Sequence, residues 1–492
     1  MSSDTAEITA AEPAAELAAV RPANLSSPHG GRARLRADTP RMTAVRDCWR
    51  ALWVSRLAVL AAGVGAVAAL GVGRARSAFD PAGVTSGFGW FGDLLAAPVA
   101  RWDAVWYLVI AHYGYRPDLG AFGTASRAAF FPLYPLGMRA LSEVAPPIAA
   151  GVAISLAALA AALYGIHRLS TLELGRLAPH GERAGDVARL AVLATALAPM
   201  AFFFSAVYSE SLYLALSVGV FWCARQGRWA SAGMLGALAS ATRSAGLVLA
   251  VPLVVLYLYG PREDRPPDFP PRLRGRAAGG GSAEAPGRAD SQPRPRWRTG
   301  GVRYGLRRDA LWILALPAGV GAYMVYLALA GGDALMPFHA QAAWNRHFAG
   351  PYVAVWDGAR AAFDGARQLL SFQRAHVYFK VAGGSPFVDA GHNVMLFAFL
   401  LAAVPMAIGV LRRLPLAYGA YVLAALALPL SYPVAPQPLM SLPRFEVVLF
   451  PLAMWLGAWL AERPRARLPA LAAMTLLMAL FTGEFATWHW VA

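Results

Sequence analysis

Apolar and polar positions alternate along this chain in long blocks rather than with the period of a surface helix. Runs of Ala, Leu, Val, Gly and aromatic residues are separated by shorter polar segments rich in arginine. In lipid every backbone amide must be satisfied within its own segment, so crossing about 30 Å of hydrocarbon takes about 20 apolar residues in a helix. The pattern predicts eleven apolar helices, some of them short, near 51–72, 148–167, 188–206, 208–224, 229–242, 245–259, 310–330, 392–411, 414–431, 446–461 and 468–483.

Arg243 interrupts the apolar pattern between two of these stretches, 229–242 and 245–259. The pair forms either one long kinked helix or a tight re-entrant pair. An ionisable residue at membrane depth is costly and is a functional hypothesis by default. The alternative for Arg243 is an arginine that extends its side chain to the outer interface.

The placement of arginine predicts how the stretches are oriented. Arginines gather in every second connecting segment, which puts the N-terminus inside the cell and the C-terminus outside. Two long segments, 73–147 and 331–391, then lie together on the non-cytoplasmic side. Both carry interleaved aromatic residues, histidines and carboxylates, and connections of this length are more often functional than idle.

The same pattern gives the domain organisation of an all-α polytopic membrane protein. Residues 1–48 form a polar cytoplasmic tail, and 260–309 form a cytoplasmic loop rich in Arg, Pro and Gly; both are predicted to be disordered. The membrane domain comprises 49–259 and 310–492.

Composition supports this class. Apolar residues make up 57% of 492 residues, charged residues 15%, and mean hydropathy is +0.45, which is outside the usual range of soluble domains. The formal charge of +16 does not indicate nucleic acid binding, because most basic residues flank apolar stretches instead of forming one basic face.

The densest chemical pattern in the first long segment runs from Arg101 to Tyr107. At helical spacing Asp103, Trp106 and Tyr107 share one face. One interpretation is an interfacial amphipathic helix in which Arg101 pairs with Asp103. The other is a general base, since a carboxylate beside aromatic residues at a membrane surface can be tuned by desolvation.

Further candidates lie in three other motifs. Tyr208 and Glu210 stand at the outer junction of two helices, where Glu210 either orients a sugar hydroxyl or pairs with Arg243. The alternative is a helix-capping serine with Glu210 as a surface carboxylate. Gln341 and Trp344 belong to a run of aromatic, amide and imidazole side chains that suits sugar binding. Arg444 follows Pro443 at the last outer turn, where the alternative is an interfacial anchor paired with Glu446.

Two common donor chemistries are absent from the sequence. The chain has no phosphate-binding Gly-x-x-x-x-Gly-Lys-Ser/Thr loop and no Asp-x-Asp pair of the kind that holds a metal in nucleotide-sugar enzymes. The histidines have no metal-ligand spacing to another ligand type. The sequence therefore implies no metal site and no cofactor.

Four motifs occur in a characteristic order. They are the run from Arg101 to Pro135, Pro199 to Leu212, Ala239 to Gly246, and Ser441 to Phe445. Together they resemble the PIG-V family of mannosyltransferases, in the GT-C class of membrane glycosyltransferases, and the chain looks most like the bacterial members. The resemblance covers roughly 49–492 without the 260–309 loop.

The resemblance implies a function. It predicts transfer of mannose from a polyprenyl-phosphate donor to a glycolipid or glycan hydroxyl, with inversion and with Asp103 as the base, and a multi-pass protein of the bacterial cell membrane. A lipid-linked sugar would be the co-substrate. Arg243 and Arg444 are the expected donor phosphate ligands, because a guanidinium forks onto two phosphate oxygens. The candidates for substrate binding are Arg101, Trp102, Trp106, Tyr107, His112, Tyr208, Glu210, Gln341 and Trp344.

Two alternatives remain open at this point. One is a transporter or flippase of a lipid-linked or polar substrate, although the chain shows no internal repeat of the transporter kind. The other is a non-catalytic member that only assembles with another enzyme. An accessory membrane subunit is a candidate partner as well.

Overall fold

The computed structural model describes residues 40–491 apart from positions 74, 82, 116–123, 176–180, 269–302, 331, 373–384 and 435–436. Within these residues the regular structure is entirely helical, and one isolated antiparallel β-bridge joins Arg346 to Val434. The predicted all-α class is therefore confirmed. The predicted tail up to residue 39 and most of the predicted 260–309 loop lie outside the described residues.

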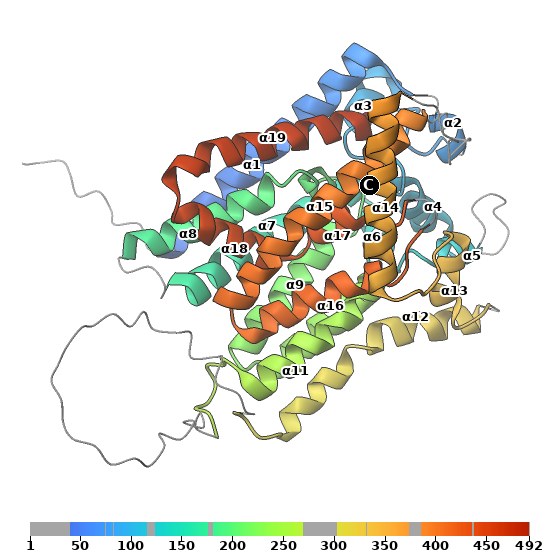
Figure 1. Ribbon diagram of the computed structural model, residues 1–492. Coiled ribbons are helices and arrows are strands. Elements are labelled where there is room, and N and C mark those ends of the chain that lie inside the picture. The colour runs from blue at the N-terminus through green and yellow to red at the C-terminus, as the bar shows by residue number, and fades with distance from the viewer. Residues whose placement is uncertain are drawn as a thin grey trace, which may run out of the picture.

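Each of the eleven predicted apolar stretches contains helix in the structure (Figure 1). The α-helices are α1 (Pro40–Leu70), α7 (Pro147–Leu174), α8 (Gly181–Ala196), α9 (Glu210–Arg225), α10 (Trp229–Thr242), α11 (Ala250–Tyr259), α12 (Ala318–Leu329), α15 (Pro386–Arg413), α16 (Leu416–Leu430), α18 (Phe450–Ala461) and α19 (Pro464–Ala486). Three 3₁₀ helices accompany them: η3 (Ala201–Phe204), η4 (Ser244–Leu249) and η6 (Arg308–Ala315).

Among the described residues, four helices are long and apolar enough to cross a bilayer: Arg41–Leu70, Pro147–Leu174, Pro386–Arg413 and Pro464–Ala486. A fifth span follows if η6 and α12, which meet at 43°, are one broken span. The other predicted stretches form helices that fall short of 18 residues. The all-helical membrane architecture thus agrees with the sequence, and the number of eleven spans stays a prediction.

The long helices carry apolar side chains on their outer faces. Leu57 of α1 is 58% exposed, Leu476 of α19 is 71% exposed and Leu329 of α12 is 83% exposed. Contiguous apolar surface of this kind marks a lipid or protein contact. Inward faces pack closely, as where Gly457 of α18 lies against Ala191 of α8 and a methyl group would come within 2.5 Å of the backbone nitrogen.

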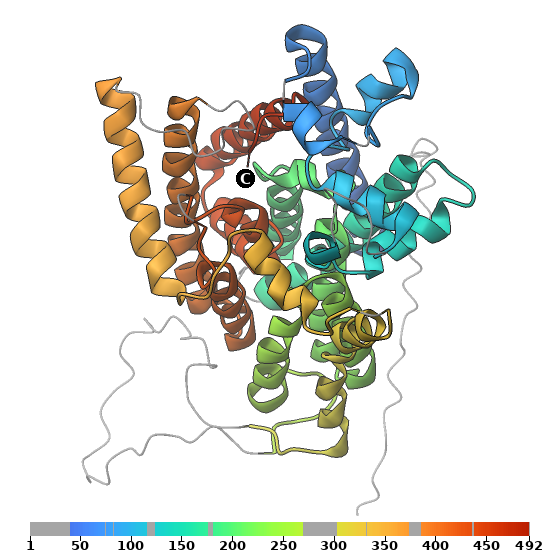
Figure 2. The same ribbon diagram turned by 90° about the vertical axis from the view of Figure 1, so that its right-hand side faces the viewer.

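Shorter helices gather at one end of the bundle, where Figure 1 places α2, α4, α5 and α13, and Figure 2 looks onto that end. They come from the two long connecting segments: α2 (Ala75–Phe79), α3 (Gly89–Ala96), α4 (Ala104–Tyr113), α5 (Thr124–Arg127), α6 (Leu133–Leu141), α13 (Met336–Ala343) and α14 (Pro351–Ser371). α13 packs against α5, and the Trp344 ring meets the edge of Trp106 with centroids 5.5 Å apart. The two segments that were predicted to share one side of the membrane therefore meet at one end of the fold.

The chain breaks its helix at Arg243. α10 ends at Thr242, Arg243 is extended at φ −157° and ψ 150°, and η4 begins at Ser244. The turn brings Gly246 onto the backbone of Ala239, where a Cβ atom would lie 2.3 Å from the carbonyl carbon. Of the two alternatives for this region, the structure has two separate helical segments joined by a tight turn, not one continuous helix.

Two boundaries differ from the sequence prediction. α1 begins at Pro40, so residues 40–48, assigned to the tail, are helical, with buried Ala44 and Cys48 on one face. The described ends of the 260–309 loop are also ordered. There the buried Arg262 pairs with the nearby Asp264 at 2.5 Å and lies over the Trp229 ring at 4.7 Å, a contact with a distant residue that no local pattern reveals.

Candidate active site

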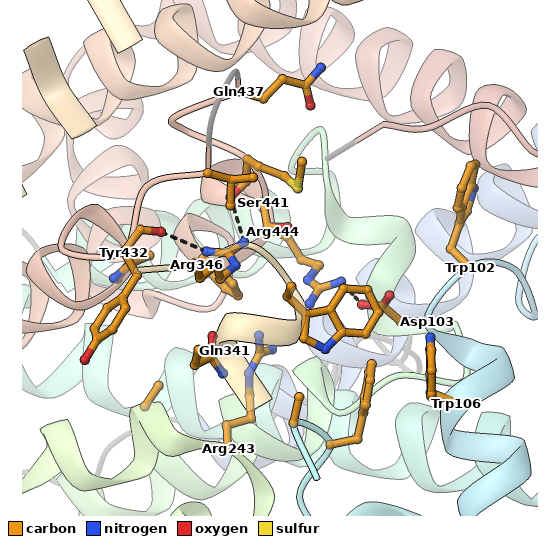
Figure 3. Close-up of a pocket in the computed structure, with 18 of the residues that line it drawn as sticks. Trp102, Asp103, Trp106, Arg243, Gln341, Arg346, Tyr432, Gln437, Ser441 and Arg444 are labelled. Carbon is orange, nitrogen blue, oxygen red and sulfur yellow. Dashed lines mark hydrogen bonds and ion pairs between the residues drawn. The ribbon is translucent and has the colours of Figure 1, made fainter. Parts of the chain in front are cut away.

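A cavity of about 980 Å³ lies where the two connecting segments meet the bundle. Its charged part is lined by Asp103, Arg243, Arg346 and Arg444 (Figure 3). Apolar side chains from η4 and α16 line the same cavity, among them Leu247, Val248, Ala425 and Leu428. The volume is at the upper end of the range for small-molecule sites, and the two kinds of lining suit a ligand with one polar and one apolar part.

Asp103 stands at the residue before α4, at the N-terminal end of that helix. Its backbone N–H donates to the Tyr208 hydroxyl at 3.0 Å, and that hydroxyl donates to the Arg101 carbonyl at 3.0 Å. Trp102 adopts a left-handed backbone with φ +55°, and its ring packs at 4.6 Å from Phe79. These contacts hold the backbone at Asp103 and at the two residues before it.

The carboxylate of Asp103 belongs to a chain of four alternating charges. Arg444 Nη1 donates to Asp103 Oδ2 at 2.5 Å, and Arg444 Nε lies 3.0 Å from Glu210 Oε1. Arg243 Nη1 donates to the same Glu210 oxygen at 2.8 Å. The side chain of Glu210 is only 1% exposed, so its charge depends on these two arginines for compensation.

Arg444 is the centre of this network. Ser441, with φ +67°, precedes the short helix α17 (Leu442–Glu446) that carries Arg444. The guanidinium lies 5.6 Å from the centroid of Tyr208 and 5.7 Å from that of Phe203. Burial alone would lower the pKa of Arg444, but Asp103 and Glu210 outweigh it and hold the pKa above its usual value. Arg444 is thus a permanent cation that lies between two carboxylates.

Arg346 is a third cation on the cavity wall, from the segment after α13. Its guanidinium donates to the carbonyls of Met440 at 3.2 Å and Tyr432 at 3.4 Å. Burial, and then the nearby Arg444, lower the pKa of Arg346 to about 10, while Asp103 acts in the opposite direction. The side chain is therefore still protonated at neutral pH.

Left-handed backbone concentrates around the cavity. Of the five non-glycine residues with positive φ in the described chain, four line it: Trp102, Asn345, Ser441 and Trp488. Three of them stand within three residues of Asp103, Arg346 and Arg444. Such conformations cost about 1–3 kcal/mol each and cluster where a site must be held in a fixed geometry. The cavity is therefore a candidate active site on backbone geometry as well as on charge.

The structure brings most of the predicted site residues together. Asp103, Arg243 and Arg444 line the cavity, as do the substrate candidates Trp102, Trp106, Tyr107, Gln341 and Trp344. Tyr208 and Glu210 lie behind the lining and act on Asp103 and the arginines. The predicted pairing of Glu210 with Arg243 is present, and Arg444 pairs with Asp103 rather than with Glu446.

Two candidates lie elsewhere. The guanidinium of Arg101 turns away from Asp103 and donates to the Ala486 carbonyl at 3.1 Å, so the alternative of an Arg101–Asp103 pair does not occur. His112 is exposed at the end of α4, with its ring against Tyr113 at 4.4 Å, and does not line the cavity. Helical spacing explains the difference, because nine residues carry His112 past the face that Asp103 and Tyr107 share.

Sequence reasoning did not single out Arg346, His392 or Gln437, which also line the cavity. Arg346 belongs to a run with Gln341 and Trp344, and its charge among aromatic residues was a usable signal. His392 and Gln437 carried none, since each reaches the cavity only through tertiary packing. In the part of the chain that the structure describes, no three His, Cys, Asp or Glu side chains are grouped as a metal site.

The fold and the cavity together define an all-α protein with membrane-spanning helices and a charged, partly apolar site at one end of the bundle. Residues 89–258, about a third of the chain, match the family described as mannosyltransferase (PIG-V). No solved structure matches the chain.

Three curated mannosyltransferases match part of the chain. The chain is 31% identical over 162 residues to GPI alpha-1,6-mannosyltransferase 2 of Rattus norvegicus, covering 32% of this chain and 31% of the relative. It is 31% identical over 160 residues to the Mus musculus protein and 32% identical over 166 residues to the Cricetulus griseus protein of that name, covering 31% of this chain and 30% of each relative. The chain thus matches about a third of the length of these relatives.

Proposed function

We propose that this protein is a membrane mannosyltransferase that moves mannose from a polyprenyl-phosphate mannose donor to the hydroxyl of a glycolipid or glycan on the non-cytoplasmic side of the membrane. The family supports the sugar and the transfer reaction. The observation that carries the proposal is that Asp103, paired with Arg444 at 2.5 Å, faces a cavity with both a cationic and an apolar lining.

In the proposed reaction the acceptor hydroxyl oxygen attacks the anomeric carbon of mannose. The bond between that carbon and the phosphate oxygen breaks, with inversion, and polyprenyl phosphate leaves as an anion. Asp103 takes the proton of the hydroxyl. No general acid is needed, because a phosphate leaving group is already a stable anion, unlike the alkoxide of a glycoside.

The other residues have supporting roles in this proposal. Arg444 and Arg243 supply the positive potential that stabilises charge developing on the phosphate. Tyr208 fixes the backbone of Asp103. Glu210 pairs with both arginines and so sets their positions relative to each other. Trp106, Trp344 and Gln341 offer the aromatic faces and the amide that sugar rings contact.

The test uses the purified full chain in lipid nanodiscs with labelled polyprenyl-phosphate mannose as donor and a membrane lipid extract as acceptor. Release of polyprenyl phosphate together with labelled product is the readout. We expect transfer by the wild type, and at least a 100-fold loss in Asp103→Asn, within the range for removal of a general base.

Two controls make the result specific. Asp93→Asn changes a carboxylate that accepts a hydrogen bond from the Phe88 amide outside the cavity, and should transfer normally. Labelled GDP-mannose without a lipid carrier should give no product. Equal transfer by the wild type and Asp103→Asn would place the base elsewhere, and use of GDP-mannose would refute the lipid-linked donor.

A further inference from the structure

We propose that Arg346, rather than Arg243 or Arg444, is the first ligand of the phosphate group of a polyprenyl-phosphate substrate. This inference rests on the proposed function for the identity of the ligand. It rests on the charges and contacts of the cavity for the identity of the residue.

The first observation is the state of the other two arginines. Arg444 is paired with Asp103 and Glu210, and Arg243 with Glu210. Two cations and two carboxylates therefore balance within this network. A phosphate that bound there would have to compete with a carboxylate already within 3.0 Å of each guanidinium, at the cost of leaving that carboxylate buried without a partner.

The second observation is that Arg346 has no such competitor. Its guanidinium donates to the carbonyls of Tyr432 and Met440, and among the described residues no carboxylate pairs with it. A guanidinium has five N–H donors, so the donors beyond these two bonds are available to an anion. Arg346 is thus the cavity arginine whose charge is not yet balanced by a carboxylate.

The third observation is that the position of Arg346 is fixed before any ligand arrives. Its backbone N–H donates to the Gln341 carbonyl at 2.9 Å, and the residue forms the β-bridge with Val434. The preceding Asn345 has φ +59°. Backbone and guanidinium are thereby both held, which reduces the ordering entropy that binding would otherwise lose.

The fourth observation concerns the lipid part of the ligand. Leu247, Val248, Ala425 and Leu428 line the same cavity as Arg346 and offer an apolar surface to a polyprenyl chain. A phosphomonoester with a long hydrocarbon chain combines the two chemistries that this cavity combines. Figure 3 shows Arg346 beside Gln341, Tyr432 and Ser441, with Arg444 between it and Asp103 in this view.

The experiment measures binding of undecaprenyl monophosphate to the full chain in nanodiscs of uncharged phosphatidylcholine, by microscale thermophoresis. A charge-assisted contact is worth about 1.5–3 kcal/mol, so Arg346→Gln should raise Kd about 10- to 100-fold. Arg360→Gln, a change of an exposed arginine on α14, is the matched control and should bind as the wild type does. Arg243→Gln and Arg444→Gln should weaken binding less than Arg346→Gln.

Further arms identify the source of the phosphate. Inorganic phosphate and phosphatidic acid are titrated in parallel, and both should bind at least 10-fold more weakly than undecaprenyl phosphate. Equal binding of inorganic phosphate or phosphatidic acid would overturn the assignment to a polyprenyl-phosphate site.

Unchanged binding in Arg346→Gln, or a larger loss in Arg444→Gln, would overturn the role of Arg346. If Arg346→Gln does not fold, Arg346→Lys retains the charge without the fork, and it should bind several-fold more weakly; wild-type affinity there would refute the inference. Because binding is read without turnover, a protein that transfers no mannose but shows this dependence on Arg346 would refute the proposed function alone.

Discussion

The guanidinium of Arg444 and the carboxylate of Asp103 are separated by 341 residues in the sequence and by 2.5 Å in the structure. Arg444 lies outside the 89–258 segment that matches the family, whereas Asp103 lies within it. The ion pair therefore joins the C-terminal part of the chain to the family segment, and it ties the position of the proposed base to α17.

Arg444→Gln should lower thermal stability substantially. Removing one partner of a buried ion pair leaves uncompensated charge and costs about 3–5 kcal/mol; here Asp103 loses its arginine partner and Glu210 loses one of its two. The melting temperature of the purified protein, followed by fluorescence, measures this. Arg413→Gln is the control, because the Arg413–Glu462 pair is largely exposed and such pairs contribute about 0–1 kcal/mol. Similar melting temperatures for the two variants would contradict a structural role for the Arg444 network.

Tyr208→Phe should slow transfer about 10-fold with little change in KM. The hydroxyl accepts from the Asp103 amide and donates to the Arg101 carbonyl, so its loss frees the backbone beside the carboxylate. Tyr134→Phe is a matched control. That buried hydroxyl donates to the Gly151 carbonyl at 2.9 Å and makes no hydrogen bond to the backbone of Asp103. Steady-state kinetics should show a reduced kcat in the first variant only; equal rates would mean that Tyr208 does not position Asp103.

Gly246→Ala should destabilise the turn that carries Arg243. The added methyl group would lie 2.3 Å from the Ala239 carbonyl carbon, and overpacking of this kind costs about 1–3 kcal/mol. Gly391→Ala, in α15, meets no atom within 4 Å and should be neutral or slightly stabilising. Thermal unfolding of both variants checks this. A Gly246→Ala protein as stable as the wild type would show that the turn can relax.

Arg56→Leu should reduce stability and activity although Arg56 does not line the cavity. Its buried guanidinium donates to the carbonyls of Ala196 at 2.9 Å and Ala201 at 2.6 Å, at the end of α8 and the start of η3. Each carbonyl left unsatisfied costs about 1–3 kcal/mol. Arg50→Leu, on the same helix but exposed, should behave as the wild type in melting temperature and transfer rate. Loss of function in both variants would point to a general effect of charge on α1.

The placement of apolar blocks was enough to locate the eleven apolar helical regions, because lipid forces the backbone to satisfy its own hydrogen bonds locally. It did not locate the helices of the two connecting segments, such as α14. The ends of the apolar helices could not be predicted from the apolar pattern. The helix that starts at Pro40 buries Ala44 and Cys48, and the turn at Arg243 brings Gly246 onto the backbone of Ala239.

The sequence by itself determined the all-α class, the two connecting segments that meet at one end, and the residues from which the site is built, among them Asp103, Arg243 and Arg444. These follow from local properties: hydropathy, charge and motif order. Only the tertiary structure decided how those residues are paired. In the structure Arg444 pairs with Asp103, and Glu210 pairs with two arginines. Arg101 points away from Asp103, and Arg346 has no carboxylate partner among the described residues. Ion pairing depends on the distance between two charges in space. A local sequence pattern does not encode that distance for two residues 341 positions apart.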